Sequence, residues 1–196
     1  MFTGIIRAVG IVEVAASGPH SHLVVRSRRR LTARAGDSVA VHGVCLTVTR
    51  THRGRLHFDM VEETRRATTL GHYRAGARVN LESALVVGDS VGGHWVLGHV
   101  DGVGRVVGRR QTPTGVSLTI APPAFLRRFL APKGAITVDG VSLTVGPGIT
   151  RGAFTVHLVP YTLGHTTLGA LRRGDRVNLE VDPLARYVVA AIDGRR

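Results

Sequence analysis

The sequence predicts an all-β protein made of two copies of a small antiparallel barrel or sandwich. Three observations lead to this fold class: short segments in which apolar and polar residues alternate, many glycines, and a long internal repeat. The chain has 196 residues, of which 25 are glycine, while aromatic residues make up only 5%. This composition favours many short strands joined by turns over long helices.

The internal repeat is visible in four blocks that recur in the same order. "HGVCLTV" and "DGVSLTV" place Cys45 and Ser142 97 residues apart. "TTLG" recurs after 98 residues, "GARVNLES" returns as "GDRVNLEV" after 98, and "GIIRAVGIV" returns as "GHVDGVGRV" after 94. Self-similarity at one period indicates a tandem duplication. We therefore expect one domain over residues 1–92, a second over 93–181, and a C-terminal helix over 182–196.

The strands of the first copy follow from period-two alternation. They are "HLVVRS", "SVAVHG", "CLTVTR", "RLHFDM" and "RVNLES", separated by turns that contain glycine. Closing such a sheet into a barrel would remove its exposed edges.

Two helices are predicted outside this pattern. One covers residues 124–130, between two prolines at its start and Pro132 at its end. The other begins after Asp182 as N-cap, with Pro183 at the first helical position. Its apolar stripe consists of Leu184, Tyr187, Val188 and Ile192. We expect this stripe to pack either on its own barrel or against equivalent helices of other subunits.

Composition excludes several functional classes. The net charge is +13, yet the arginines are scattered in pairs and triples without interleaved aromatic residues, which disfavours nucleic-acid binding. The N-terminus lacks the pattern of a signal peptide, and no apolar run approaches the roughly 20 residues of a membrane span. A single cysteine excludes an internal disulfide and a multi-cysteine zinc site. We expect a soluble intracellular protein that binds neither nucleic acid nor membrane.

No cofactor or metal motif is found in the sequence. A phosphate-binding loop and a His/Cys/carboxylate cluster at ligand spacing are both lacking, and "GVGRVVG" at residues 102–108 does not have the spacing of a dinucleotide fingerprint. We therefore expect no cofactor and no metal.

Five motifs in order carry a family resemblance. "MFTGII", "GVCLTV", "GGHWVLGHVDG", "PKGAITVDGVSLTV" and "TTLG…VNLE" resemble the riboflavin synthase family over residues 1 to about 190. The resemblance implies two six-stranded antiparallel Greek-key barrels, each binding one 6,7-dimethyl-8-ribityllumazine. It also implies a homotrimer held by the C-terminal helices, with each active site between the N-terminal barrel of one subunit and the C-terminal barrel of its neighbour.

The activity implied by the resemblance is a transferase step of riboflavin biosynthesis in the cytoplasm. Two identical lumazines dismutate, a four-carbon unit passes between them, and the products are riboflavin and 5-amino-6-ribitylamino-uracil. Lumazine synthase, which makes the substrate, is a candidate partner. The alternative is a non-catalytic lumazine- or flavin-binding relative, in which the second site is degraded. Here the second copy is intact, which favours the enzyme.

The two repeated hairpins supply the main candidate residues. Ser142 and Thr144 lie two apart on a strand, so they share a face, and Cys45 and Thr47 do the same. Spacing alone favours hydroxyls that pair with neighbouring backbone. The resemblance instead assigns Ser142 and Thr144 to the second pocket, for proton handling or addition at C7 of the substrate. Cys45 lines the first pocket or acts as a nucleophile, and lining is favoured.

Other polar residues receive roles from the same resemblance. Asp139 is an expected orienting group, although an Asp before Gly is often only a turn residue. His42 stands where the family commonly has Asn, which makes a pocket role doubtful. His99 is expected in the second pocket as a proton carrier, whereas His94 is expected to be structural. Lys133, the only lysine, is an expected ligand contact.

The resemblance thus implies two residue sets. The catalytic set is Ser142, Thr144, Asp139, His99, Cys45 and Phe2. The first pocket is expected to include Phe2 and residues 4–6, and the second pocket residues 98–100. The segments "DMVEET" and "HLVPYT" are expected to hold the ribityl chains. Tyr161 of the second copy stands where the first copy has Glu63. The substrate-binding set is Gly4, Ile5, Ile6, Val44, Cys45, Leu46, Asp59, Glu63, Thr64, Gly98, His99, Val100, Lys133, Ser142, Leu143, Thr144, His157, Pro160, Tyr161 and Thr162.

Overall fold

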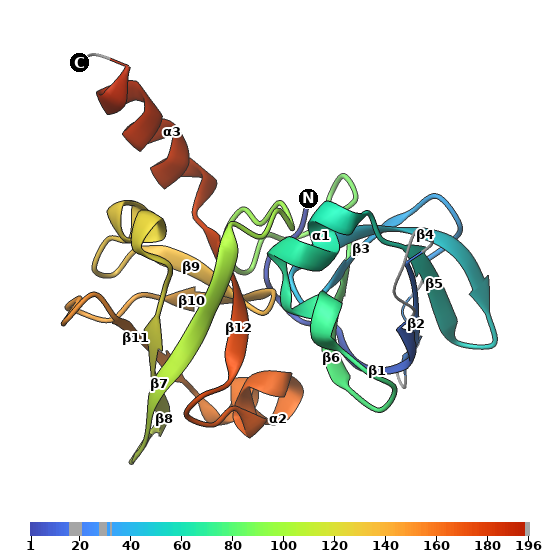
Figure 1. Cartoon of the computed structure of the whole chain (residues 1–196), viewed down its shortest axis with the longest axis horizontal. Helices are drawn as coiled ribbons and strands as arrows, with labels where there is room; N and C mark the ends of the chain where they lie inside the picture. The colour runs from blue at the N-terminus through green and yellow to red at the C-terminus, as the bar shows by residue number, and fades with distance from the viewer. Residues whose placement is uncertain (16–20, 28–30, 32, 195–196) are drawn as a thin grey trace.

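A computed structural model describes residues 1–15, 21–27, 31 and 33–194. Two β units lie side by side, and a helix projects from the second (Figure 1). The arginine runs at 28–30 and 195–196, the latter closing the expected C-terminal segment, lie outside the described residues.

The first unit is a closed six-stranded antiparallel barrel. Its strand order is β1-β2-β5-β4-β3-β6, in which β3 and β6 pair although they are far apart in the sequence. The strands are β1 (Ala8–Ala15), β2 (His22–Ser27), β3 (Ser38–Val41), β4 (Val44–His52), β5 (Arg55–Asp59) and β6 (Arg78–Ser83).

The second unit repeats this topology in the order β10-β9-β12-β7-β8-β11. A single bridge between Val145 and Val156 joins the two ends of the sheet. The expected duplication of a six-stranded antiparallel barrel is therefore confirmed. The strands are β7 (Gly102–Thr112), β8 (Gly115–Ala121), β9 (Ala135–Val138), β10 (Val141–Thr144), β11 (Phe154–Leu158) and β12 (Arg176–Val181).

Each barrel has its own apolar core, because the inward residues of every strand meet in its interior. Phe58 is fully buried in the first core and Phe154 in the second. Alternation along β8 is typical of this arrangement, with Val116, Leu118 and Ile120 buried and the residues between them partly exposed.

Both predicted helices are present. Residues Ala124–Phe129 form the 3₁₀ helix η2, and Pro183–Asp193 form α3. Asp182 caps α3 as expected, since its side chain accepts a hydrogen bond from the backbone N–H of Leu184 at 2.9 Å.

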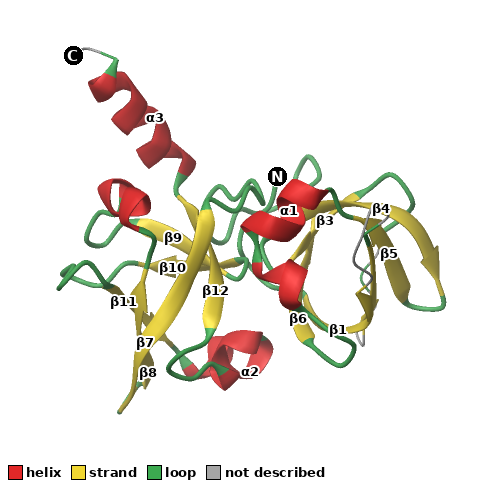
Figure 2. Cartoon of the chain, in the orientation of Figure 1, coloured by secondary structure: helices red, strands yellow, loops and turns green. Residues whose placement is uncertain are grey.

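Short helices before and within each "TTLG" block were not predicted (Figure 2). They are α1 (Glu62–Ala67) with η1 (Thr69–His72), and α2 (Pro160–His165) with η3 (Thr167–Ala170). Each is too short to show a helical period in the sequence, and segments of this length are not stable helices on their own. They recur at equivalent places, which extends the duplication to the connections between strands.

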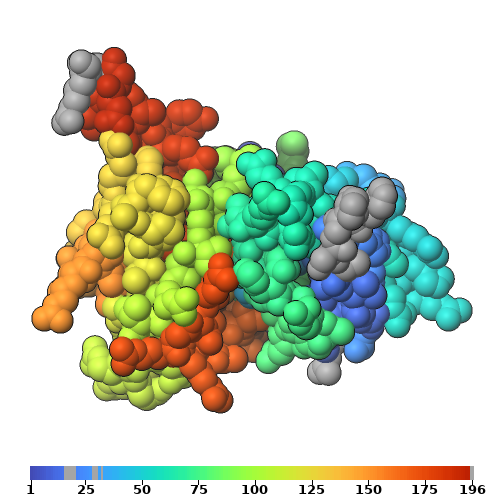
Figure 3. Space-filling model, viewed as in Figure 1, coloured from blue at the N-terminus to red at the C-terminus, as the bar shows by residue number. Residues whose placement is uncertain are grey.

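Helix α3 stands out from the body of the molecule (Figure 3). Its apolar stripe is not covered by its own barrel: Leu184 is 64% exposed, Tyr187 73% and Val188 58%. An ion pair between Arg128 and Asp193 fixes the far end of the helix to η2. Among the described residues, no helix is both long and apolar enough to cross a membrane.

Candidate active site

The two repeated motifs form the tips of equivalent hairpins. His42-Gly43 joins β3 to β4, and Asp139-Gly140 joins β9 to β10. All four residues have positive φ, between 48° and 84°, as two-residue type I′ turns require. The tips meet: a Cβ on Gly43 would lie 2.6 Å from the backbone nitrogen of Gly140. Only glycine fits there, so the duplicated turn is also the contact between the barrels.

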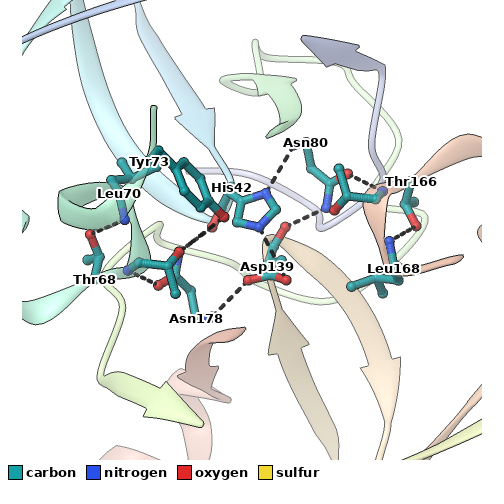
Figure 4. A network of polar contacts seen from close by, with 11 residues as sticks. His42, Thr68, Leu70, Tyr73, Asn80, Asp139, Thr166, Leu168 and Asn178 are labelled. Carbon is teal, nitrogen blue, oxygen red and sulfur yellow. Dashed lines mark hydrogen bonds and ion pairs between the residues drawn. The ribbon is translucent and has the colours of Figure 1, made fainter. Parts of the chain in front are cut away.

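His42 and Asp139 face each other across this contact (Figure 4). The backbone N–H of Asn80 donates to His42 Nδ1 at 3.2 Å, which leaves the proton of the neutral ring on Nε2. Nε2 lies 3.2 Å from Asp139 Oδ2, which is close enough for an ion pair, but the two groups are not aligned as a hydrogen bond requires. In the other copy, the N–H of Asn178 donates to Asp139 Oδ1 at 2.8 Å. His42 Nδ1 and Asp139 Oδ1 therefore have the same structural role.

Two buried asparagines join the copies further. Asn80 Nδ2 donates to the carbonyl of Asp139 and Asn178 Nδ2 to the carbonyl of His42, both at 2.9 Å. Their side-chain oxygens accept from the backbone N–H of Thr167 and Thr69, both at 2.8 Å (Figure 4). Each asparagine thus reaches into the opposite copy. A buried polar network of this kind specifies one relative arrangement of the barrels.

The segments before β1 and β7 cross between the barrels. Phe2 and Val96 pair through two backbone hydrogen bonds of 2.7 and 3.1 Å. Beyond this pair, the carbonyl of Gly4 accepts from the N–H of Ser142 at 2.8 Å. A Cβ on Gly4 would lie 2.6 Å from the Cβ of Ser142, so this approach also needs glycine.

The mirror contact is made at the other hairpin. The carbonyl of Gly98 accepts from the N–H of Cys45 at 2.9 Å, and a Cβ on Gly98 would lie 2.6 Å from the Cβ of Cys45. We name the two stretches, residues 1–6 and 94–100, the crossing segments. The first segment places Gly4 against Ser142 of the second repeat, and the other places Gly98 against Cys45 of the first repeat.

The crossing places these segments at the hairpins opposite to those with which they were expected to share a pocket. Segment 4–6 was expected at the first pocket, but Gly4 lies on Ser142 and Ile6 packs on the second core. Segment 98–100 was expected at the second pocket, but Gly98 lies on Cys45 and Val100 packs on the first core. The physical reason is the Phe2–Val96 pairing, after which each segment continues to the other barrel. Phe2 itself clusters with Ala40 and Cys45 of the first barrel.

Two glutamates hold the crossing segments. Glu82 Oε1 accepts from the N–H and the hydroxyl of Thr3 at 2.7 and 2.6 Å, and Oε2 accepts from the N–H of Gly4 at 3.0 Å. Glu180 accepts from the N–H of Leu97 and Gly98 at 2.8 and 3.0 Å. Burial raises the pKa of both carboxyls, and these hydrogen bonds act in the opposite direction. Sequence reasoning missed both, although each ends a repeated "VNLE".

Ser142 has a partner that the sequence did not predict. Its Oγ lies 2.7 Å from His94 Nδ1, and His94 Nε2 lies 3.2 Å from the hydroxyl of Thr137. Burial lowers the pKa of His94, while the charge of Asp182 acts in the opposite direction, so the ring is neutral at pH 7. A hydroxyl beside a neutral imidazole is suited to proton transfer. His94 lies outside the four repeated blocks, so the repeat did not point to it.

The remaining residues of the hairpin strands divide by face. Cys45, Ser142 and Leu143 are half-buried, and Thr144 is exposed. Val44 and Leu46 are buried in the first core, so they offer a ligand only backbone atoms. Asp139 is fully buried between the barrels. It touches the opposite hairpin at His42.

Other candidate residues lie on the connecting elements. Glu63 and Thr64 are in α1, and 160–162 begin α2, with Tyr161 stacked on His165 at 3.9 Å between ring centroids. Asp59 contacts His22, and His157 contacts Thr114. Ile5, His99 and Lys133 are exposed.

Comparison with known proteins gives the family. The model for the lumazine binding domain matches residues 3–84 and 97–182. Riboflavin synthase of Mycobacterium bovis is 45% identical over 194 residues, covering 96% of both chains. Riboflavin synthase of Bacillus subtilis is 37% identical over 190 residues, covering 96% of this chain and 88% of the relative. The chain belongs to the riboflavin synthase family.

Solved structures agree with the fold. LumP complexed with riboflavin matches with a TM-score of 0.81 at 25% identity, covering 92% of this chain and 99% of that one. LumP complexed with 6,7-dimethyl-8-(1'-D-ribityl) lumazine matches with a TM-score of 0.80 at 23% identity and the same coverage. The expected family, its enzyme class and its fold are confirmed.

Proposed function

We propose that this chain dismutates two molecules of 6,7-dimethyl-8-ribityllumazine into riboflavin and 5-amino-6-ribitylamino-uracil. Its relatives named riboflavin synthase, at up to 45% identity, support the enzyme over a non-catalytic binding protein. The observation that carries the proposal is a duplicated frame with two different side chains at one position. Cys45 and Ser142 each donate the backbone N–H to the carbonyl of a crossing-segment glycine, but among the residues that the structure describes, a histidine touches Ser142 alone of the two. A dismutation needs this inequality, because two identical substrates must react differently.

The residues around Ser142 supply proton transfer. The substrate has an acidic methyl group on C7 and an electrophilic C7. His94 Nδ1 is placed to accept the hydroxyl proton of Ser142, while Nε2–H donates to Thr137. The freed oxygen then takes a proton from the methyl group or adds to C7; both routes use the same pair. Holding the two rings together supplies a further several kcal/mol of barrier lowering.

The other candidate residues bind or position. Cys45 and Phe2 line the first pocket, next to Gly98. Asp139 is a positioning residue, because it is buried behind the turn that carries Ser142. His99, Lys133 and Thr144 are accessible and contact the substrate, and residues 59–64 and 157–162 hold the ribityl chains.

We also propose that three chains assemble through α3. Its exposed stripe of Leu184, Tyr187 and Val188 needs an apolar partner. Assembly would bring the first barrel of one subunit to the second barrel of its neighbour and complete each active site. The protein acts in the cytoplasm, and lumazine synthase, which releases the substrate, is a candidate partner.

One assay tests the activity. Purified protein is given only 6,7-dimethyl-8-ribityllumazine, and the absorbance of riboflavin is followed. We expect riboflavin to form with no added cofactor or metal. Tight binding of the lumazine without turnover would favour the non-catalytic alternative.

A second measurement tests the assembly. Val188→Glu places a charge in the stripe of α3, and Ala190→Glu places the same charge outside it, on the same helix. The mass in solution should fall to that of a monomer for the first variant only. A monomeric parent protein, or trimers in both variants, would contradict assembly through this stripe.

A further inference from the structure

A cavity lies between the barrels, and neither Cys45 nor Ser142 is among its lining residues. It has a volume of about 430 Å³, in the size range of small-molecule sites. Both copies contribute equivalent residues to its wall. Three pairs of equivalent positions line it: His42 with Asp139, Thr69 with Thr167, and Arg78 with Arg176.

The floor of this interbarrel cavity has two residues, Asp139 and Thr167, whose buried polar atoms make no hydrogen bond among the described residues. Asp139 is fully buried, and its Oδ2 makes no hydrogen bond within the described part of the chain, although His42 Nε2 lies 3.2 Å away at a poor angle. The hydroxyl of Thr167 is also buried and unpaired among the described residues. Buried polar atoms are normally hydrogen-bonded, so two such atoms on residues that line one cavity point to a ligand that supplies hydroxyl or N–H groups.

The mouth of the cavity is basic. Arg78 and Arg176 begin the equivalent strands β6 and β12, and both side chains are exposed. Two smaller hollows also have Arg78 in their walls and add Arg109 and Arg7. Asp175 is the acidic side chain at this mouth among the lining residues. Guanidinium groups bind phosphate well because each offers several N–H donors, and Arg176 keeps further donors besides the Nη1 that lies 2.8 Å from His72 Nε2.

One pair of equivalent positions in the wall differs between the copies, so the two sides of the cavity differ in polarity. Tyr73 stands on the side of the first copy, where the second copy has Leu171. The hydroxyl of Tyr73 accepts from Thr69 Oγ1 at 3.3 Å, and burial raises its pKa, so the group stays protonated and can donate. A bound molecule would therefore meet hydrogen-bonding groups on one side and an apolar wall on the other.

We propose that this cavity binds a phosphorylated sugar or sugar alcohol. The phosphate lies at the mouth on Arg78 and Arg176, and the hydroxyls lie at the floor on Asp139 Oδ2 and Thr167 Oγ1. The opposite orientation is excluded, because it would place the phosphate against the buried carboxylate of Asp139. Such a ligand would occupy the point where the two hairpin tips meet, and so act on both pockets together.

The test is a binding measurement that does not depend on turnover. Ribose 5-phosphate is titrated into the full-length protein by calorimetry, with ribose and inorganic phosphate as comparison probes. Saturating riboflavin is present to occupy the pockets at Cys45 and Ser142. We expect ribose 5-phosphate to bind at least tenfold more tightly than either comparison probe. Equal affinity for inorganic phosphate, or no saturable binding, would overturn the proposal.

Three variants locate the bound molecule. Arg78→Gln with Arg176→Gln should remove the advantage of ribose 5-phosphate over ribose. Thr167→Val should reduce its affinity towards that of inorganic phosphate, while the backbone contact of Thr167 with Asn80 is kept. Arg151→Gln, in an exposed turn of the second barrel, is the matched control and should bind like the parent protein. Unchanged binding in the first two variants would overturn the proposal, whether or not the protein forms riboflavin.

Discussion

The hairpins that carry Cys45 and Ser142 have the same backbone and different surroundings. Each has a type I′ turn at its tip. Cys45 and Ser142 each donate the backbone N–H to a glycine carbonyl of a crossing segment. His94 touches Ser142, whereas Cys45 has no imidazole contact of this kind among the described residues. The comparison shows that duplication supplies the frame twice, and that the contact with His94 distinguishes the surroundings of Ser142 from those of Cys45.

The largest expected effect comes from replacing the Ser142 and Cys45 side chains separately, which tests whether the two hairpins have different roles. Ser142→Ala should lower kcat by about 100-fold, because it removes a proton-transfer group. Cys45→Ser should lower kcat by less than about tenfold, because a lining residue is replaced by one of similar size. Steady-state rates of riboflavin formation measure both. Equal losses would mean that the two hairpins are not specialised as proposed.

The next test removes the asymmetric partner. His94→Gln should lower kcat by about tenfold at neutral pH, since Gln can hydrogen-bond to Ser142 but cannot take its proton. Because burial lowers the pKa of His94, the acid limb of the parent rate profile should lie below the pH at which an ordinary histidine becomes protonated.

The same titration affects stability. The unfolded chain takes up this proton near pH 6.5 and the folded chain resists it, so folding stability from this group is lost as the pH falls below 6.5. Unfolding must therefore be followed in parallel with the rate. An acid limb of the rate profile that persists in His94→Gln would assign that limb to another group.

A third test uses the crossing segments to sharpen the comparison. Glu82→Gln turns an accepting oxygen into an NH₂ group that faces the N–H of Thr3 or Gly4, and this mismatch costs about 1–3 kcal/mol. Glu180→Gln does the same beside Cys45. Although Glu82 belongs to the first barrel, its variant should reduce turnover several-fold more than Glu180→Gln, because Gly4 supports Ser142. A larger loss for Glu180→Gln would contradict the crossed arrangement.

The smallest effect on turnover is expected at the contact between the turns. His42→Ala leaves the N–H of Asn80 unpaired and should lower the free energy of unfolding by about 1–3 kcal/mol. His42→Asn should change it by less than about 1 kcal/mol, because Asn Oδ1 can replace Nδ1 as acceptor. Denaturant titration compares them. Equal destabilisation by Ala and Asn would show that the Nδ1 contact is not the important one.

Local patterns were sufficient to predict most of the fold. Alternation gave β2 to β6, Asp182 and Pro183 gave the start of α3, and the offsets of 97 and 98 residues gave the second barrel. These features depend on residues close in sequence or on similarity between copies. The short helices were missed because six residues are too few to show a helical period.

The site was predicted less completely, because its key contacts join distant residues. The motif pointed to Ser142, but a pattern of alternation says only which face a side chain takes. It cannot show that His94 approaches from 48 residues away or that Gly4 reaches the other barrel. His42 was doubted because it departs from the family, yet its Nδ1 has the structural role of Asp139 Oδ1.

The crossing segments also set an order of events during synthesis. The strands of the first barrel are complete at Ser83, but the segment that supports Cys45 includes Gly98, and Gly4 must wait for Ser142. When residues 1–83 have emerged from the ribosome, Glu82 can already hold Thr3 and Gly4, but the contacts of the N-terminal segment with Val96 and Ser142 cannot yet form. Domains generally fold as units from the N-terminus onward. Here the first unit reaches its final form only after most of the second has emerged, so premature termination within the second repeat would leave both halves incomplete.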